Sequence, residues 1–134
     1  MQLPTVGLLI IQNRKLLLAF SNNKQCFYLP GGKVDKGETT TNALCREINE
    51  ELNIILDEKQ LTYYTHITAQ AYGEPAGIIM EQDCFLIETE NEAMAASEIG
   101  ELKFFSLKEY IGEKNTAPGA IIILERLQRD GLID

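Results

Sequence analysis

The sequence predicts an α/β fold in which a mixed β-sheet is flanked by helices. Segments rich in Val, Ile and Leu and bounded by turn residues indicate strands, and apolar residues three and four positions apart indicate helices. Three strands come before the first helix, and further strands separate it from a final helix. With 134 residues, 45% of them apolar, the chain has the size and composition of one domain spanning residues 1–134.

The first half of the chain contains short strands, a glycine turn and a helix. The strands are expected at 4–12, 15–20 and 26–29, with Pro30, Gly31 and Gly32 stopping the last of them. The helix is expected at about 40–52, with Thr39 as its N-cap, because a Thr hydroxyl accepts a free amide of the first turn. Asn53 is expected to end the helix, since Asn is the usual non-glycine residue in the left-handed cap conformation.

The second half contains two long strands, a polar loop, another strand and a final helix. These are expected at 60–72, 77–88, 89–100, 101–106 and 117–129 respectively. The turn between the two long strands contains Gly73, Pro75 and Gly77. This order of elements fits a mixed sheet with helices on its faces.

The composition excludes several classes of protein. A net charge of −8 with no basic patch argues against a nucleic-acid polymer as partner, and it means that a polyphosphate would be repelled without cations. Cys26, Cys45 and Cys84 lack CxxC spacing and are expected to be reduced thiols. No signal peptide or membrane span is apparent, so we expect a cytoplasmic protein without membrane contact.

Three carboxylates share one face of the expected 40–52 helix. Glu47, Glu50 and Glu51 are spaced i, i+3 and i+4, which places them side by side. Like charges at this spacing repel one another, and a solvated helix gives no reason to group them. Mg²⁺ binds carboxylate oxygens together with water and substrate phosphates. The cluster therefore predicts a metal-dependent site for phosphate chemistry.

The segment 32–54 resembles the Nudix box, the signature of the Nudix hydrolases. In that pattern a Gly is followed after five residues by Glu, after seven more by Arg-Glu and an aliphatic residue, and then by Glu-Glu, a Gly and an aliphatic residue. The matching positions here are Gly32, Glu38, Arg46, Glu47, Ile48, Glu50, Glu51 and Ile54, with Asn53 in place of the Gly. The resemblance implies a Nudix-type α/β/α sandwich with a mixed sheet flanked by helices.

The resemblance also implies roles for the carboxylates. Glu50 and Glu51 would coordinate Mg²⁺, with Mn²⁺ as a substitute, while Glu47 would be either a third metal ligand or the base that accepts a proton from water. Arg46 points about 100° away from Glu47 around the helix. By resemblance it pairs with Glu38 or a neighbouring carboxylate and fixes the loop over the helix.

Further residues are candidates for supporting the metal site. Glu38 precedes the helix cap, where a negative charge is favourable, and is assigned a supporting place near the metals. Gly31 and Gly32 allow the backbone to approach a phosphate or a metal. By resemblance a loop Glu before the 101–106 strand faces the metals as base or ligand. Glu98 takes that place, although a plain loop carboxylate is equally compatible and Glu101 is nearer the strand.

Several aromatic residues and one Asn are candidates for contacts with a base. Phe27, Tyr28 and Tyr72 are candidates for stacking, although aromatics in strands are more often core residues. By resemblance, purine-specific members use an Asn near the final helix, and Asn115 is close to that region. His66 has no partner at motif spacing and is interpreted as structural.

The expected function is Mg²⁺-dependent hydrolysis of a diphosphate linkage in a small nucleotide. A nucleoside 5′-triphosphate, cleaved to monophosphate and pyrophosphate, is the leading substrate. ADP-ribose or another nucleoside-diphosphate-linked compound is the alternative within the same chemistry. The alternative from a different class is a catalytically silent Nudix-like module that binds a nucleotide to regulate a partner, but such modules lose carboxylates that are present here. A monomer and a homodimer are both compatible with the sequence.

Overall fold

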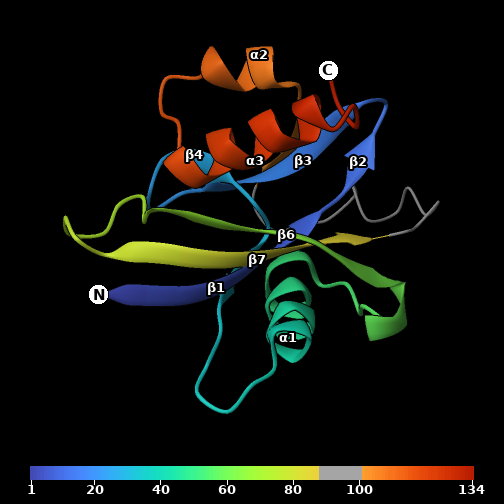
Figure 1. Ribbon diagram of the computed structural model, residues 1–134, viewed down its shortest axis with the longest axis vertical. Helices are drawn as coiled ribbons and strands as arrows, with labels where there is room; N and C mark the ends of the chain where they lie inside the picture. The colour runs from blue at the N-terminus through green and yellow to red at the C-terminus, as the bar shows by residue number, and fades with distance from the viewer. Residues whose placement is uncertain (88–100) are drawn as a thin grey trace.

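The structure, a computed structural model, describes residues 1–87 and 101–134. It confirms a mixed α/β fold in layers, with one helix below a sheet and the remaining helices above it (Figure 1). In chain order the elements are β1 (Gln2–Leu9), β2 (Ile11–Gln12), β3 (Lys15–Ser21), β4 (Cys26–Tyr28), β5 (Gly31–Lys33), α1 (Thr40–Leu52), the 3₁₀ turn η1 (Glu58–Gln60), β6 (Leu61–Gln70), β7 (Ile79–Ile87), β8 (Leu102–Phe105), α2 (Leu107–Ile111) and α3 (Pro118–Arg129).

The strands form two sheets. The first sheet has the order β5-β1-β7-β6 and is mixed, because β1 pairs with β7 in parallel and its other pairs are antiparallel. The second sheet has the order β2-β3-β4, with β8 paired to β3. The strand expected at 4–12 is therefore divided, since its residues belong to β1 and β2. Ile10 is the crossing point, and its carbonyl already accepts from Leu17 of the second sheet at 2.9 Å.

The strand expected at 26–29 does stop before Pro30, but the glycine segment after Pro30 is itself a strand and not a turn. Gly31–Lys33 pairs with β1 in antiparallel register, with Gly31 opposite Gly7. At Gly31 φ is +144°, and a Cβ would lie 2.0 Å from the carbonyl oxygen of Val6. Only glycine fits at this close approach of two backbones. The short helix α2 was also not expected.

The first helix has the ends that the sequence predicts. The Thr39 hydroxyl accepts from the Asn42 amide at 3.1 Å, and Asn53 is in the left-handed conformation with φ 55° and ψ 37°. Leu44, Ile48 and Leu52 are buried against the first sheet. This apolar face fixes the rotation of α1 and therefore the direction of its carboxylates.

The core has one part on each side of the first sheet. One part lies between α1 and β1, β3 and β7, and the other lies between the two sheets and α3. Across the described residues, no helix combines the length and the apolar character needed to cross a membrane. The strand edge at β5 is where α1, β1 and the glycine segment meet.

Candidate active site

Helix α1 brings Glu47 and Glu51 against the backbone of β5. A Cβ at Gly32 would lie 2.5 Å from the Glu47 carboxyl carbon, so the glycine makes room for that carboxylate. The Gly31 amide donates a hydrogen bond to Glu51 Oε2 at 3.4 Å. Both glycines therefore contact the carboxylate face of α1, and Gly31 supplies a donor to it.

Arg46 connects α1 to the loop after β5. Its Nε and one terminal nitrogen donate to the two oxygens of Glu38, both at 2.9 Å, and its other terminal nitrogen donates to Glu47 Oε1 at 3.0 Å. It also donates to the Lys33 carbonyl at 3.1 Å and lies 3.3 Å from Asp35. The expected pair with Glu38 is present. The offset of about 100° between Arg46 and Glu47 around the helix does not keep them apart, because the long Arg46 side chain bends back to Glu47.

The carboxylates experience two opposite electrostatic environments. Hydrogen bonds from Arg46 and from the Asp35 amide lower the pKa of Glu38 to about 2. Burial raises the pKa of Glu51 to about 7, against the opposing Gly31 hydrogen bond, and neighbouring Glu47 and Glu50 add to the rise. Burial also raises the pKa of Glu47, although Arg46 partly opposes it. Glu51 is thus a desolvated carboxylate without a cationic partner among the described residues.

Such a carboxylate set fits a hard divalent cation. Oxygen ligands and an excess of negative charge are what Mg²⁺ binds, and Glu51 gains most from a cation because burial destabilises its charge. Glu50 is 61% exposed and lies 3.6 Å from Arg46. Within residues 1–87 and 101–134, no three acidic, His or Cys side chains already converge on one point that could hold an ion. Binding would therefore need the flexible Glu side chains to turn inward.

A cavity of about 400 Å³ extends from these carboxylates along one face of the first sheet. Glu47, Glu51, Gly31 and Gly32 border one end of it. Its remaining walls come from β1, β4 and its flanking residues, β5, β6, β7, the 71–74 turn and the start of α3. Apolar and aromatic residues form more than half of these walls, which include Leu3, Thr5, Lys24, Tyr28, Leu29, Lys33, Tyr72, Met80, Gln82 and Gly119. Tyr28 and Tyr72 line this cavity, whereas Phe27 is buried beside Phe20 and Phe105.

Some predicted site residues are not brought to this cavity. Glu98 lies outside the described residues, so its role stays a prediction. Glu101 is exposed, and its carbonyl accepts from Phe20 at 2.8 Å. The Asn115 amide donates to the Gln25 carbonyl at 2.8 Å and lines a different hollow beside Phe20 and Lys114.

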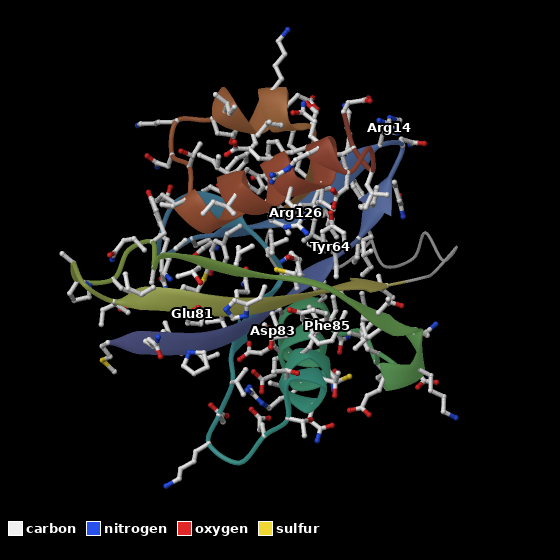
Figure 2. All side chains as sticks on the ribbon, viewed as in Figure 1. Arg14, Tyr64, Glu81, Asp83, Phe85 and Arg126 are labelled. Atoms are coloured by element: carbon white, nitrogen blue, oxygen red, sulfur yellow. The ribbon has the colours of Figure 1, made fainter. Side chains whose placement is uncertain are left out.

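His66 has partners that sequence spacing did not reveal. Its two ring nitrogens lie 2.8 Å from Asp83 Oδ1 and 2.8 Å from Glu81 Oε1, on the neighbouring strand β7. Glu81, Asp83 and Phe85 follow one another along β7 (Figure 2) and share the face of the sheet that α1 covers at Phe85. These hydrogen bonds raise the pKa of His66. Both ring nitrogens of His66 therefore have partners, and its structural interpretation stays a prediction.

Two groups of residues at the site were missed from the sequence. Asp35 joins the contacts of Arg46, and its place inside the segment 32–54 was an available signal. Thr5 and Gln82 also lie in the cavity wall, and no motif in the sequence singled out either of them. Only the pairing of β1 with β7 brings these two together.

Comparison with known proteins assigns the family. The sequence model described as the NUDIX domain matches residues 1–127. A match over nearly the whole chain, together with the layered fold and the carboxylate helix packed on a glycine strand, shows that the chain belongs to the Nudix family. The recognition made from the segment 32–54 is confirmed.

Individual relatives agree with this assignment. The chain is 34% identical over 103 residues, or 75% of its length, to a Methanocaldococcus jannaschii protein named ADP-ribose pyrophosphatase, and it spans 59% of that relative. The crystal structure of a MutT NUDIX hydrolase from Burkholderia pseudomallei is similar with a TM-score of 0.72 and 24% identity, over 95% of this chain and 98% of that one. The solution structure of the E. coli ORF135 protein is similar with a TM-score of 0.66 and 25% identity, over 96% and 89%. These structures share the α/β/α fold.

Proposed function

We propose that the protein hydrolyses a diphosphate linkage of a nucleotide in a Mg²⁺-dependent reaction. The leading substrate is a nucleoside 5′-triphosphate, cleaved to nucleoside monophosphate and pyrophosphate. The observation that carries the proposal is the position of Glu47 and Glu51, which border a nucleoside-sized cavity at its glycine-lined end.

The polyphosphate would lie at the β5 end of the cavity. Glu47, Glu50 and Glu51 are the residues that would hold the metal there. When bound, Mg²⁺ supplies positive charge that offsets the charge developing on the phosphoryl oxygens and on the leaving pyrophosphate. Lys24 and Lys33, which also line the cavity, add positive charge at the same end or along its wall. Little covalent chemistry is left to the protein, so placement and charge compensation dominate.

The attacking water needs a group that orients it and accepts its proton. Glu47 is one candidate, because burial favours its protonated form and Arg46 fixes one of its oxygens. The other role for Glu47 is that of a third metal ligand, in which case Glu98 is the candidate base. Arg46 is a positioning residue in both schemes, since it holds Glu47 and Glu38 without needing to touch the substrate.

A second substrate has its own support. The relative named ADP-ribose pyrophosphatase is 34% identical to this chain. ADP-ribose contains the same kind of diphosphate linkage, and its hydrolysis would give AMP and ribose 5-phosphate. The regulatory alternative has less support, because all the carboxylates of the segment 32–54 are retained.

A panel of substrates with Mg²⁺ tests the proposal. Nucleoside triphosphates and ADP-ribose are incubated with the protein, and orthophosphate, pyrophosphate and monophosphate are measured separately. We expect monophosphate and pyrophosphate from a triphosphate, and hydrolysis in ¹⁸O-labelled water to place the label in the monophosphate if attack is at the sugar-proximal phosphorus. Orthophosphate as the main first product would contradict the triphosphate pyrophosphohydrolase, and turnover of ADP-ribose alone would select the second substrate.

A further inference from the structure

Two polar side chains lie side by side among the apolar and polar residues that line the cavity. Thr5 on β1 and Gln82 on β7 are direct neighbours in the parallel pairing of these strands. They are only 8% and 7% exposed, yet both line the cavity. A buried polar group is costly unless a hydrogen bond satisfies it. The pair is therefore expected to have partners, in the protein or in a ligand.

The protein satisfies only part of this pair. The Thr5 hydroxyl donates to the Glu81 carbonyl at 3.4 Å, and Gln82 Oε1 lies 3.8 Å from the Cys84 thiol. Gln82 Nε2 donates to no atom of the described residues. Among those residues, every side-chain nitrogen or oxygen that is fully shielded from solvent has a partner, so Nε2 is not fully shielded. The Nε2 group is thus open to the cavity with both hydrogens available. Thr5 Oγ1, whose hydrogen is used, can still accept a hydrogen bond.

The surroundings leave room for this amide without satisfying it. A Cβ at Gly7 would lie 3.1 Å from Gln82 Nε2 and 2.8 Å from a methyl carbon of Leu29, so the glycine leaves room for the amide. Met80, which precedes Gln82 by two residues on the same face, contributes an apolar wall. A cavity with apolar walls and a few fixed polar groups is typical of a small-molecule site in which the polar groups give specificity.

The register of the first sheet gives the separation between Gln82 and the carboxylate end. Lys33 on β5, Thr5 on β1 and Gln82 on β7 lie opposite one another across three adjacent strands. Two strand spacings amount to roughly 10 Å. A nucleotide with its phosphates at β5 would therefore place its base, rather than its sugar, beside β7.

We propose that Gln82 is a specificity-determining residue for the nucleobase. Its side-chain Nε2 donates to an acceptor atom on the edge of the base, and Thr5 Oγ1 accepts from a neighbouring donor on the same edge. A base with a carbonyl oxygen or ring nitrogen beside an N–H group satisfies both side chains, whereas a purine ring without that N–H group leaves Thr5 Oγ1 unpaired. This inference rests on the proposed nucleotide hydrolysis and adds how the base is chosen.

The test compares substrates that share a ring and differ in the carbonyl oxygen and the N–H group on one edge of the base. kcat and KM are measured separately for the inosine and purine-riboside triphosphates and for the four common triphosphates, with wild-type protein and with Gln82→Met, which keeps the side-chain length and removes the amide. We expect the wild type to favour its best base over its poorest by about 10- to 100-fold in kcat/KM, because an unpaired buried donor penalises the wrong base. In Gln82→Met this ratio should fall to within about threefold, with the loss mainly in KM.

Gln70 gives a matched control. It also borders the cavity, but its Nε2 already donates to the Pro75 carbonyl at 3.2 Å and its Oε1 accepts from the Gly77 amide at 3.3 Å. Gln70→Met is therefore expected to keep the wild-type ratio between bases. If Gln70→Met and Gln82→Met lowered the ratio equally, base selection would not come from the free amide and the proposal would be wrong.

A second variant covers the case in which Gln82→Met does not fold. Thr5→Val keeps the shape of the side chain and removes the acceptor, and it should also lower the ratio between bases, by about 3- to 10-fold. An unchanged ratio in folded Gln82→Met, or in Thr5→Val if only that variant folds, overturns the inference while the hydrolysis itself stands. Absence of hydrolysis of every nucleotide by the wild type would overturn both the inference and the proposed function.

Discussion

Two groups of charged residues each have one cationic side chain among carboxylates. The first group lies on α1 and the loop after β5, at one edge of the first sheet, and the second lies on β6 and β7, at the other edge. In the Arg46 group, Arg46 lies within 4 Å of Asp35, Glu38, Glu47 and Glu50. In the His66 group, His66 lies between Glu81 and Asp83, and Thr68 donates to Glu81 at 2.6 Å. The first group borders the cavity through Asp35 and Glu47, with Glu51 beside them, and neither carboxylate of the second lines it.

The difference lies in the charge that remains after pairing. One guanidinium cannot neutralise four carboxylates and buried Glu51, so the Arg46 group retains an excess of negative charge that a divalent cation would offset. In the His66 group, hydrogen bonds with Glu81 and Asp83 raise the pKa of His66. The pKa of Glu81 is lowered mainly by its hydrogen bond from Thr68 and then by its hydrogen bond with His66. The features that favour the proposed metal site are the excess of carboxylates over cations, the burial of Glu51 and the cavity beside it.

The largest effect should follow from neutralising the buried carboxylate. Glu51→Gln is expected to retain the fold and to lower kcat by at least about 100-fold, the scale seen when a catalytic electrostatic group is removed. Glu81→Gln, in the His66 group, should stay within about threefold of wild type, because it lies away from the cavity. Steady-state kinetics on the best substrate, with circular dichroism as the folding check, compare the two. Near wild-type turnover of folded Glu51→Gln would exclude the metal-site assignment.

An intermediate effect should follow from replacing the cation of the Arg46 group. Arg46→Lys keeps the charge but cannot hold both oxygens of Glu38 together with Glu47, because an ammonium lacks the planar fork. The Mg²⁺ concentration for half-maximal rate should rise by about 10- to 100-fold, as for other residues that orient metal ligands. His66→Gln is the matched control and should leave this Mg²⁺ dependence unchanged. Equal Mg²⁺ dependence of Arg46→Lys and wild type would show that Arg46 does not position the carboxylates.

Most of this architecture could be predicted from local sequence. The cap of α1 at Thr39, its left-handed end at Asn53 and the carboxylate spacing depend on residues within one helix, so the pattern contains them. Helix α2 also has a local signal, because Ser106 and Glu109 form a capping box at its start. This pair of residues could have predicted the helix. Two successive glycines predicted a turn at Gly31 and Gly32. They instead form a strand paired with β1, and Gly31 is needed there because its backbone lies so close to the Val6 carbonyl.

Features that depend on strand pairing could not be predicted. The contacts of His66 with Glu81 and Asp83 arise from the antiparallel register of β6 with β7. The neighbours Thr5 and Gln82 are far apart in the chain and meet only through the parallel pairing of β1 with β7. A single sequence gives the alternation of each strand but not which strands are neighbours. The cavity wall is therefore less predictable than the carboxylate helix.

A smaller effect, confined to stability, should mark the His66 group. The pKa of His66 is raised in the folded protein, so its contribution to stability is complete below the unfolded pKa of about 6.5 and is lost as pH rises through the folded value. The pKa of Glu81 is lowered, so its contribution is lost instead as pH falls through its folded value. Wild type should therefore exceed His66→Gln in Tm most clearly between about pH 5 and 6.5, by no more than roughly 4 °C.

The pH dependence of this difference is the decisive measurement. Tm is recorded for wild type, His66→Gln and Asp83→Asn from pH 5 to 9. The advantage of wild type over His66→Gln should shrink above the folded pKa, and Asp83→Asn should be intermediate because His66 keeps its contact with Glu81. A difference that grew with pH would mean that neutral His66 is the form that stabilises the fold.

The smallest effect is expected at Asn53, where α1 ends beyond the Arg46 group. This residue departs from the Nudix pattern, in which a Gly stands here, but its φ of 55° is the conformation that a Gly would adopt. In Asn53→Gly the relief of left-handed strain and the greater freedom of the unfolded chain oppose one another, so stability should change by less than about 1 kcal/mol. Turnover should stay within about twofold, because the site depends on contacts made along α1 rather than on the chemistry of its cap.

Asn53→Val provides the contrast, since a β-branched residue at positive φ should lose roughly 1–2 kcal/mol. Chemical denaturation and steady-state kinetics of the three proteins decide the matter. A large loss of turnover in a stable Asn53→Gly protein would mean that the Asn side chain itself orients a carboxylate or the substrate.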